Sequence, residues 1–384
     1  MSGVGTDGDG DNANRPTNVI HVDEDESSTS PPTSNERSQS KTQPSQTSLW
    51  VKGHLVDLKI RVSSFCDTSK SPLDIVNMLR IGQPLNDMAS VEVQAKVLAA
   101  KIKNMTVFRY ILDKVFDDMS LGDALHLSTE PRLWKIHAIE TKDEERFNDR
   151  FRVSGQSFAM WLRHCIYSRD VTKETVSEFM YQHLFVLFLQ LFGVKCLFAP
   201  GIPKRTMRIG NQNISGTPDI MASLYSRQNS SLQCKTLFVC EVKKDYDRTD
   251  EPQPKSPRFS SPTSRPDPPM PDALLGQHGA ELLMYYPTSL AKNVIIGMIV
   301  EKTYVSFTTL SVTSPQYEGI LKGSLKSDRE HGPKLIYTRP YNYLVKKDRD
   351  YLIESFLRLG LIQELGENNL IKSQFLPVCS TTAS

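Results

Sequence analysis

Two short motifs supply the side chains that a metal-dependent, phosphodiester-cleaving site would need. Pro218 and Asp219 form the first motif, and Glu241, Val242 and Lys243 form the second. Mg²⁺ takes oxygen ligands and commonly uses one or two carboxylates together with several waters. Asp219 and Glu241 are therefore candidate ligands of Mg²⁺ or Mn²⁺. Lys243 could orient or deprotonate a water, or it could stabilise developing negative charge.

The same residue types also have an ordinary explanation. Strand ends that face solvent often carry a Glu-Lys pair, and a Pro-Asp pair often starts a turn. The two explanations differ in one structural requirement, because a site exists only if the chain folds so that the two motifs meet. The elements around the motifs therefore decide between them.

Two β-like segments would position the motifs. Residues 236 to 244 are rich in β-branched and aromatic side chains and are predicted to form a strand, on which Glu241 and Lys243 share one face. The opposite face would carry Phe238, Cys240 and Val242. A second strand is predicted over residues 218 to 225, and the polar segment between the two strands allows an antiparallel hairpin. That hairpin would place Asp219 beside Glu241.

A buried helix is predicted before the hairpin, over Val171 to Phe192, with a start near Thr172 and an end at Gly193. Glu178 lies in its first half, ahead of a stretch too apolar to face solvent. We interpret Glu178 as a site residue. The alternative is an exposed carboxylate near a helix start, where negative charge is favourable.

A second helix is predicted after the hairpin, over Pro271 to Tyr286. Gln277 and Glu281 lie four residues apart on it and therefore share a face. Two apolar strands are predicted to follow, over residues 293 to 301 and 303 to 312.

These motifs and their order resemble the PD-(D/E)XK nuclease superfamily. The resemblance covers roughly residues 171 to 312 and implies an α/β protein with a restriction-endonuclease-like core, in which helices flank a mixed β-sheet. It implies that Asp219 and Glu241 bind the metal and that these residues form the catalytic site: Glu178, Asp219, Glu241, Lys243 and Gln277. Glu281 departs from the pattern, because many members carry a tyrosine there, and this leaves the subfamily open.

The resemblance implies a Mg²⁺- or Mn²⁺-dependent nuclease that cuts DNA endonucleolytically, with RNA left open as a substrate. A shared fold does not establish a shared activity. The alternative is a catalytically silent nuclease fold that binds nucleic acid or protein in the nucleus. The presence of Asp219, Glu241 and Lys243 in unaltered form favours catalysis.

The charge of the chain agrees with a nucleic-acid partner. The 384 residues carry a formal charge of +2, but residues 1 to 48 hold eight acidic and three basic side chains, which leaves +7 for the remainder. Two basic clusters are candidates for phosphate binding or for ordinary solvated surface. They are Lys204, Arg205 and Arg208, and Lys346, Lys347 and Arg349.

The cysteine spacing and the hydropathy of the chain indicate the cellular compartment. The six cysteines show no paired metal-ligand spacing and are predicted to be reduced. No signal peptide and no apolar stretch of membrane-spanning length is present, so we expect an intracellular protein without a membrane partner.

The first 48 residues are predicted to be a disordered acidic tail. Within it, Val19, Ile20 and Val22 lie beside a run of acidic side chains and resemble a SUMO-interacting motif. Such a motif implies SUMO, or a SUMO-modified protein, as a partner and a nuclear setting. The alternative is an ordinary acidic patch.

The rest of the chain divides into further predicted segments. Residues 49 to 170 are predicted to be helix-rich, with helical spacing over 90 to 118 and 121 to 127 and a strand over 133 to 139. Trp134 and Trp161 could stack bases, but core positions are the more common role. Residues 171 to 365 form the nuclease-like domain, interrupted by a proline-rich disordered insertion at 245 to 272. Residues 366 to 384 are predicted to be a flexible tail.

Overall fold

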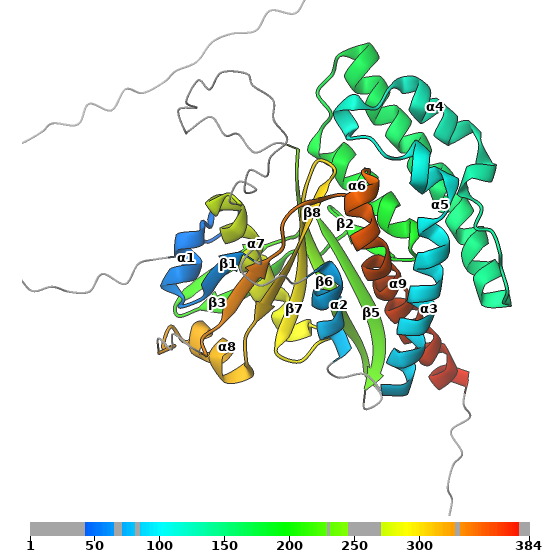
Figure 1. Ribbon diagram of the computed structural model, residues 1–384. Helices are drawn as coiled ribbons and strands as arrows, with labels where there is room; N and C mark the ends of the chain where they lie inside the picture. Colours follow the sequence, from blue (N-terminus) through cyan, green and yellow to red (C-terminus); the bar gives the residue numbers. More distant parts are fainter. Residues whose placement is uncertain are drawn as a thin grey trace, which may run out of the picture. The chain divides into compact units, whose positions relative to one another are not determined.

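The structure, a computed structural model, describes residues 43–64, 71–80, 85–228, 231–244, 270–326 and 331–375 (Figure 1). The α-helices are α1 (Lys52–Asp57), α2 (Pro72–Asn77), α3 (Leu85–Lys103), α4 (Leu121–Thr129), α5 (Lys142–Tyr167), α6 (Glu178–Leu191), α7 (Asp272–Tyr285), α8 (Ser314–Leu321) and α9 (Lys346–Phe375). The strands are β1 (Arg61–Ser64), β2 (Cys196–Phe198), β3 (Arg205–Ile209), β4 (Gln212–Gly216), β5 (Ile220–Gln228), β6 (Ser231–Lys243), β7 (Val294–Glu301), β8 (Tyr304–Ser311), β9 (Lys334–Tyr337) and β10 (Tyr341–Asn342). The predicted SUMO-interacting residues, Val19, Ile20 and Val22, and residues 245–269 of the predicted proline-rich insertion lie outside the described residues.

A mixed β-sheet organises the described part of the chain. Its strand order is β1-β9-β8-β7-β6-β5-β2, with β10 paired to β8, and β3 and β4 form a separate pair. The pairs β6–β7 and β1–β9 are parallel, and the others in the sheet are antiparallel. The prediction of an α/β protein with a mixed sheet flanked by helices is confirmed.

The predicted hairpin is formed by β5 and β6. The two strands pair antiparallel with Ile220 opposite Cys240, and the register shifts between Ala222 and Ser223. This register brings the residue before β5, Asp219, level with the end of β6. The strand β7 then pairs parallel to β6, with α7 as the crossover between them.

The sheet separates two hydrophobic cores, and the alternation predicted for β6 is confirmed. Phe238, Cys240 and Val242 belong to the core that also contains side chains of α3, α5, α6 and α9. Val239 belongs to the other core, with side chains of α1 and α7. Figure 1 shows α3, α5 and α9 on one side of the sheet and α1 and α7 on the other. Glu241 therefore points to the α7 side.

Glycine residues allow the segment around α1 to approach α7 closely. A Cβ atom on Gly276 would lie 2.2 Å from the main chain of Val51, and one on Gly279 would lie 2.5 Å from the Leu55 side chain. Only a hydrogen fits at such distances. The contact matters for the site, because α7 carries Gln277 and Glu281.

The helix predicted to start near Thr172 begins six residues later. The chain passes through a π-helical turn, η7 (Ser168–Thr172), and Lys173 then adopts a left-handed conformation with φ of 57°. Ser177 caps α6 by accepting a hydrogen bond from the main-chain N–H of Met180, so regular helix starts at Glu178. The predicted end is confirmed, and Gly193 follows with φ of 81°.

The strand predicted over residues 133 to 139 is wrong. The chain forms a short 3₁₀ turn, Pro131–Trp134, and no strand follows. Trp134 is fully buried as a core residue, and Ala138 has a positive φ of 56° that interrupts extended backbone. The predicted helical stretch over 90 to 118 is also divided, since α3 ends at Lys103.

Two elements link neighbouring predicted segments. The region over 49 to 170 is helix-rich, but it also supplies β1, which pairs with β9 in the main sheet. Helix α9 runs to Phe375 and so overlaps the tail predicted over residues 366 to 384. Within α9, Arg349 is fully buried, so it is not part of a surface basic cluster.

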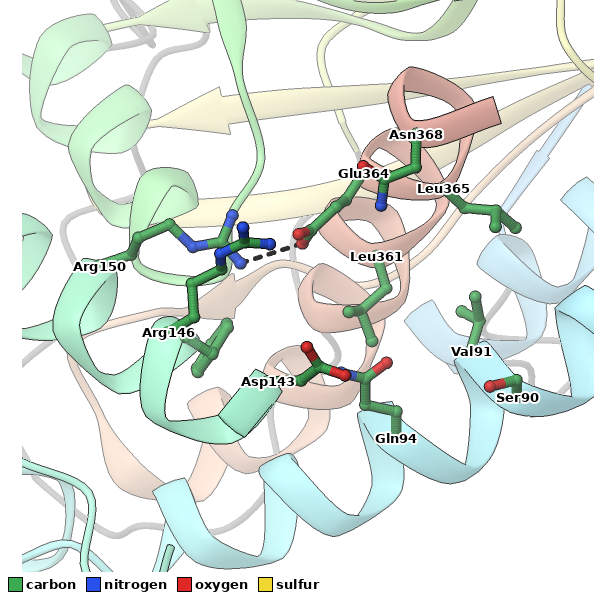
Figure 2. A pocket seen from close by; sticks show the side chains of 11 residues that line it. Ser90, Val91, Gln94, Asp143, Arg146, Arg150, Leu361, Glu364, Leu365 and Asn368 are labelled. Atoms are coloured by element: carbon green, nitrogen blue, oxygen red, sulfur yellow. Dashed lines mark hydrogen bonds and ion pairs between the residues drawn. The ribbon is translucent and has the colours of Figure 1, made fainter. Parts of the chain in front are cut away.

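Three further features of the described residues are a cavity between helices, the state of the cysteines and the hydropathy of the helices. A cavity of about 220 Å³ lies between α3, α5 and α9, and Arg150 in its lining is paired with Glu364 at 3.0 Å. Figure 2 shows the side chains that line it. Cys165, Cys196, Cys234 and Cys240 are free thiols, as predicted. Among the described residues, no helix combines the length and apolar character needed to cross a membrane.

Candidate metal and catalytic site

The five residues predicted to form the site converge at one end of the β5–β6 hairpin. Asp219 precedes β5, and Glu241 and Lys243 end β6. Helix α6 contributes Glu178 from its first turn, and α7 contributes Gln277. Hydrogen bonds and ion pairs connect these residues. The hairpin and the two flanking helices thus bring together residues that are far apart in the sequence.

Asp219 is held through both its side chain and its main chain. Oδ2 accepts a hydrogen bond from the main-chain N–H of Val242 at 2.7 Å. Its carbonyl oxygen accepts from Nε2 of Gln182 at 2.5 Å and from the N–H of Ala199 at 2.9 Å. The carboxylate is therefore fixed on the partner strand that carries Glu241.

Glu241 is the most enclosed group of the predicted site, with 1% of its surface exposed. Its Oε1 accepts from Nζ of Lys243 at 2.5 Å and from Nε2 of Gln277 at 2.6 Å. Its Oε2 is buried and accepts no hydrogen bond from an N–H or hydroxyl group, and the carboxyl group of Glu281 lies within hydrogen-bonding reach of Glu241. A buried acceptor without an N–H or hydroxyl donor is uncommon and costly in proteins, so this oxygen needs either a shared proton or a ligand.

Lys243 links the two acidic sides of the site. Its ammonium group lies 3.6 Å from Oε1 of Glu178 in addition to its contact with Glu241. Glu178 remains partly exposed, with 42% of its side-chain surface open to solvent. The structure thus places Glu178 beside Lys243, and Glu178 is more exposed than Glu241.

Glu281 is a further carboxyl group beside Glu241. It is fully buried, its Oε1 lies 3.3 Å from Nε2 of Gln277, and its Oε2 has no N–H or hydroxyl donor. Thr47, from the 3₁₀ turn η1 (Thr47–Leu49), places its hydroxyl 3.5 Å from Oε1 of Glu281. The spacing from Gln277 showed Glu281 on the correct helix face, but no sequence signal connects Thr47 to α7.

The carboxyl groups destabilise one another's charge. Burial raises the pKa of Glu241 to about 8, and repulsion from Asp219 adds to that rise against the attraction of Lys243. Burial likewise raises the pKa of Asp219. Burial, followed by repulsion from Glu241 and Asp219, raises the pKa of Glu281 well above its ordinary value. Such crowding of acidic groups is typical of functional sites.

The charged form of Lys243, unlike that of the carboxyl groups, is stabilised by its surroundings. Burial disfavours its ammonium form, but attraction from Glu241, Asp219 and Glu178 outweighs that effect and raises its pKa. Lys243 is therefore a cation at neutral pH in this arrangement. A cation can stabilise negative charge on a phosphate, whereas a general base must be deprotonated. The positive charge of Lys243 therefore favours a role in stabilising negative charge over a role as a general base.

Two observations decide whether these residues suit a divalent cation. Within the ranges that the structure describes, no group of three or more His, Cys, Asp and Glu side chains is arranged to hold a metal ion. Mg²⁺, however, needs only one or two carboxylates because water and substrate oxygens complete its shell. Asp219 and Glu241 provide two, and Oε2 of Glu241, which has no N–H or hydroxyl donor, is an available acceptor. The donor set thus fits Mg²⁺ or Mn²⁺.

The remaining predicted basic groups contribute less directly. Arg205 stacks on the Tyr285 ring, 4.3 Å from its centroid, and donates to Thr288 at 2.9 Å. Lys204 and Arg208 are exposed. Arg205 is therefore occupied in holding the β3–β4 pair against α7.

Comparison with known proteins gives no further guide: neither a protein-family model nor a curated protein sequence matches this chain.

Proposed function

We propose that this chain is a metal-dependent nuclease of the PD-(D/E)XK type, with a restriction-endonuclease-like core, that hydrolyses phosphodiester bonds in DNA. One observation carries the proposal: Glu241 is buried beside Asp219, Lys243 and Gln277, and one of its oxygens has no N–H or hydroxyl donor. Burying a carboxylate in this way is costly unless a shared proton or a ligand completes its environment. A structural ion pair would not need the adjacent Asp219.

The residues have distinct roles in this proposal. Asp219 and Glu241 would hold the Mg²⁺ or Mn²⁺ ion. When bound, the ion lowers the pKa of a coordinated water and offsets phosphate charge. Gln277 donates to Oε1 of Glu241, which leaves Oε2 for the ion.

Lys243 supplies positive charge next to the carboxylates. Its ammonium group is fixed between Glu241 and Glu178, so it needs little rearrangement to face a phosphate oxygen. Preorganised charge of this kind stabilises a transition state more than a mobile surface charge does. Glu178 therefore acts as a positioning residue for Lys243.

Cleavage of linear, circular and branched DNA by the purified full chain tests the proposal. We expect Mg²⁺- or Mn²⁺-dependent cutting that EDTA abolishes and that Asp219→Asn and Lys243→Ala each reduce by about 100-fold or more. Glu318→Gln is the matched control, since Glu318 is an exposed carboxylate on α8 whose partner is Lys322. Circular dichroism would verify that all variants fold.

Two results would contradict the proposal. Equal cutting by wild type and Asp219→Asn would place the activity elsewhere. Binding of DNA by wild type without any cutting, under every divalent cation tested, would instead support the silent binding module.

A further inference from the structure

An exposed aromatic side chain lies at the edge of the candidate site. Phe179 follows Glu178 in the first turn of α6, and 51% of its surface is exposed. One face of this ring is backed by another aromatic side chain.

His183, one helical turn later, backs the Phe179 ring. The two rings are nearly parallel, at an interplanar angle of 19° and a centroid distance of 6.1 Å. Two further rings meet the imidazole edge to face: Trp161 at 4.4 Å and Phe198 at 5.9 Å. The indole N–H of Trp161 is in turn fixed by the carbonyl of Met180 at 3.0 Å.

This group of four rings, which we call the aromatic platform, is apolar in character. Burial lowers the pKa of His183, so its imidazole is neutral at neutral pH. The platform therefore presents one flat, rigid ring to solvent, Phe179, on a neutral support. Rigid aromatic faces of this type stack bases without distinguishing their sequence.

The platform is joined to the catalytic residues by short connections. Gln182, adjacent to His183, donates to the Asp219 carbonyl. Phe198 pairs with Ile220 on β5, and the next residue, Ala199, donates to the same Asp219 carbonyl. Strand β2, which carries Phe198, lies next to β5 and two strands from β6.

We propose that Phe179 stacks on an unpaired base close to the scissile phosphate, which makes single-stranded or locally unpaired DNA the preferred substrate class. The inference rests on the proposed nuclease function and specifies its substrate. In a continuous duplex the base faces are covered by their neighbours, so a protein ring can stack on them only where the strand is open or the base is extruded. Phe179 is thus a specificity-determining residue, and Lys243 and the carboxylates act on the backbone.

Binding measurements with the full chain separate this inference from the proposed function. Fluorescence anisotropy would be recorded in Ca²⁺, with a labelled single strand and with the same strand annealed to its complement. We expect Phe179→Ala and Phe179→Leu to weaken binding of the single strand by about tenfold or more, and Phe179→Trp to retain it. Duplex binding should not change. Tyr110→Ala, at a ring that is 69% exposed on a different element, is the matched control.

The outcomes are distinct. Unchanged single-strand affinity in Phe179→Ala, or an equal loss on single strand and duplex, would overturn the inference, and the nuclease proposal would survive if wild type still cuts. Wild type that neither binds nor cuts any DNA would overturn both.

Discussion

The side-chain amide of Gln277 on α7 donates to Oε1 of Glu241 on β6 across 2.6 Å. Lys243 donates to the same oxygen, while Oε2 of Glu241 has no N–H or hydroxyl donor. One oxygen of the buried carboxylate thus has two donors and the other has none. Helix α7 and the end of β6 each supply one donor to Oε1.

Replacing Gln277 should therefore be costly. Gln277→Ala removes a donor from a buried carboxylate, and we expect it to lower the free energy of unfolding by about 1–3 kcal/mol. Gln182→Ala is the matched control, because the Asp219 carbonyl that accepts from Gln182 also accepts from Ala199. Urea denaturation would measure both variants. An equal decrease in the free energy of unfolding of both variants would show that the Gln277–Glu241 contact stabilises the fold no more than the Gln182–Asp219 contact does.

His278, next to Gln277 on α7, should make stability depend on pH. It is fully buried, its Nε2 lies 2.7 Å from the hydroxyl of Thr308, and burial lowers its pKa from 6.5 to about 3. The unfolded chain then binds a proton below pH 6.5 that the folded chain does not, so stability is lost as the pH falls. This contribution is present above pH 6.5 and decreases below it.

The magnitude can be measured against a variant. Between pH 7.5 and 5.5, we expect the unfolding free energy of wild type to fall by about 1.4 kcal/mol relative to His278→Gln. The comparison cancels the raised pKa of Glu241, which acts in the opposite direction because the folded state holds that proton more tightly. A difference between the two proteins that stays constant with pH would show that His278 does not titrate in this way.

Arg349 should be a structural residue, not a nucleic-acid contact. Its guanidinium donates to the carbonyls of Tyr343, Leu344 and Phe108 and lies over the Phe108 ring. Arg349→Ala leaves these carbonyls buried without partners, and we expect a loss of about 3 kcal/mol in thermal or urea unfolding. The exposed neighbour Lys347 is the control, with an expected change within about 0.5 kcal/mol on substitution by alanine. A small effect at Arg349 would contradict the assigned role.

The strands and helices next to the motifs were predictable because their signals are local. Alternation over residues 236 to 244 and the apolar runs after α7 each lie within one element, and the structure contains β6, β7 and β8 there. Thr47 shows where such reasoning stops. It meets Glu281 across 234 positions of sequence, through packing that requires Gly276 against Val51, and no local pattern encodes that approach.

The start of α6 illustrates a second limit. The apolar period of the helix continues the pattern before it, so the sequence offered Thr172 as a start. The backbone instead turns at Lys173 and the side chain of Ser177 caps the helix. A single capping hydroxyl is a weaker signal in a sequence than a long apolar run. It nevertheless sets the start of the helix at Glu178, the residue that contacts Lys243.

The most direct test is a crystal structure of the protein grown with Mn²⁺, with anomalous data collected to locate the ion. The account predicts one Mn²⁺ bound by oxygens of both Asp219 and Glu241 at about 2.1 Å, with Lys243 alongside, and no such ion in Asp219→Asn. Absence of Mn²⁺ from these carboxylates at saturating concentration, or an ion bound only elsewhere, would contradict it.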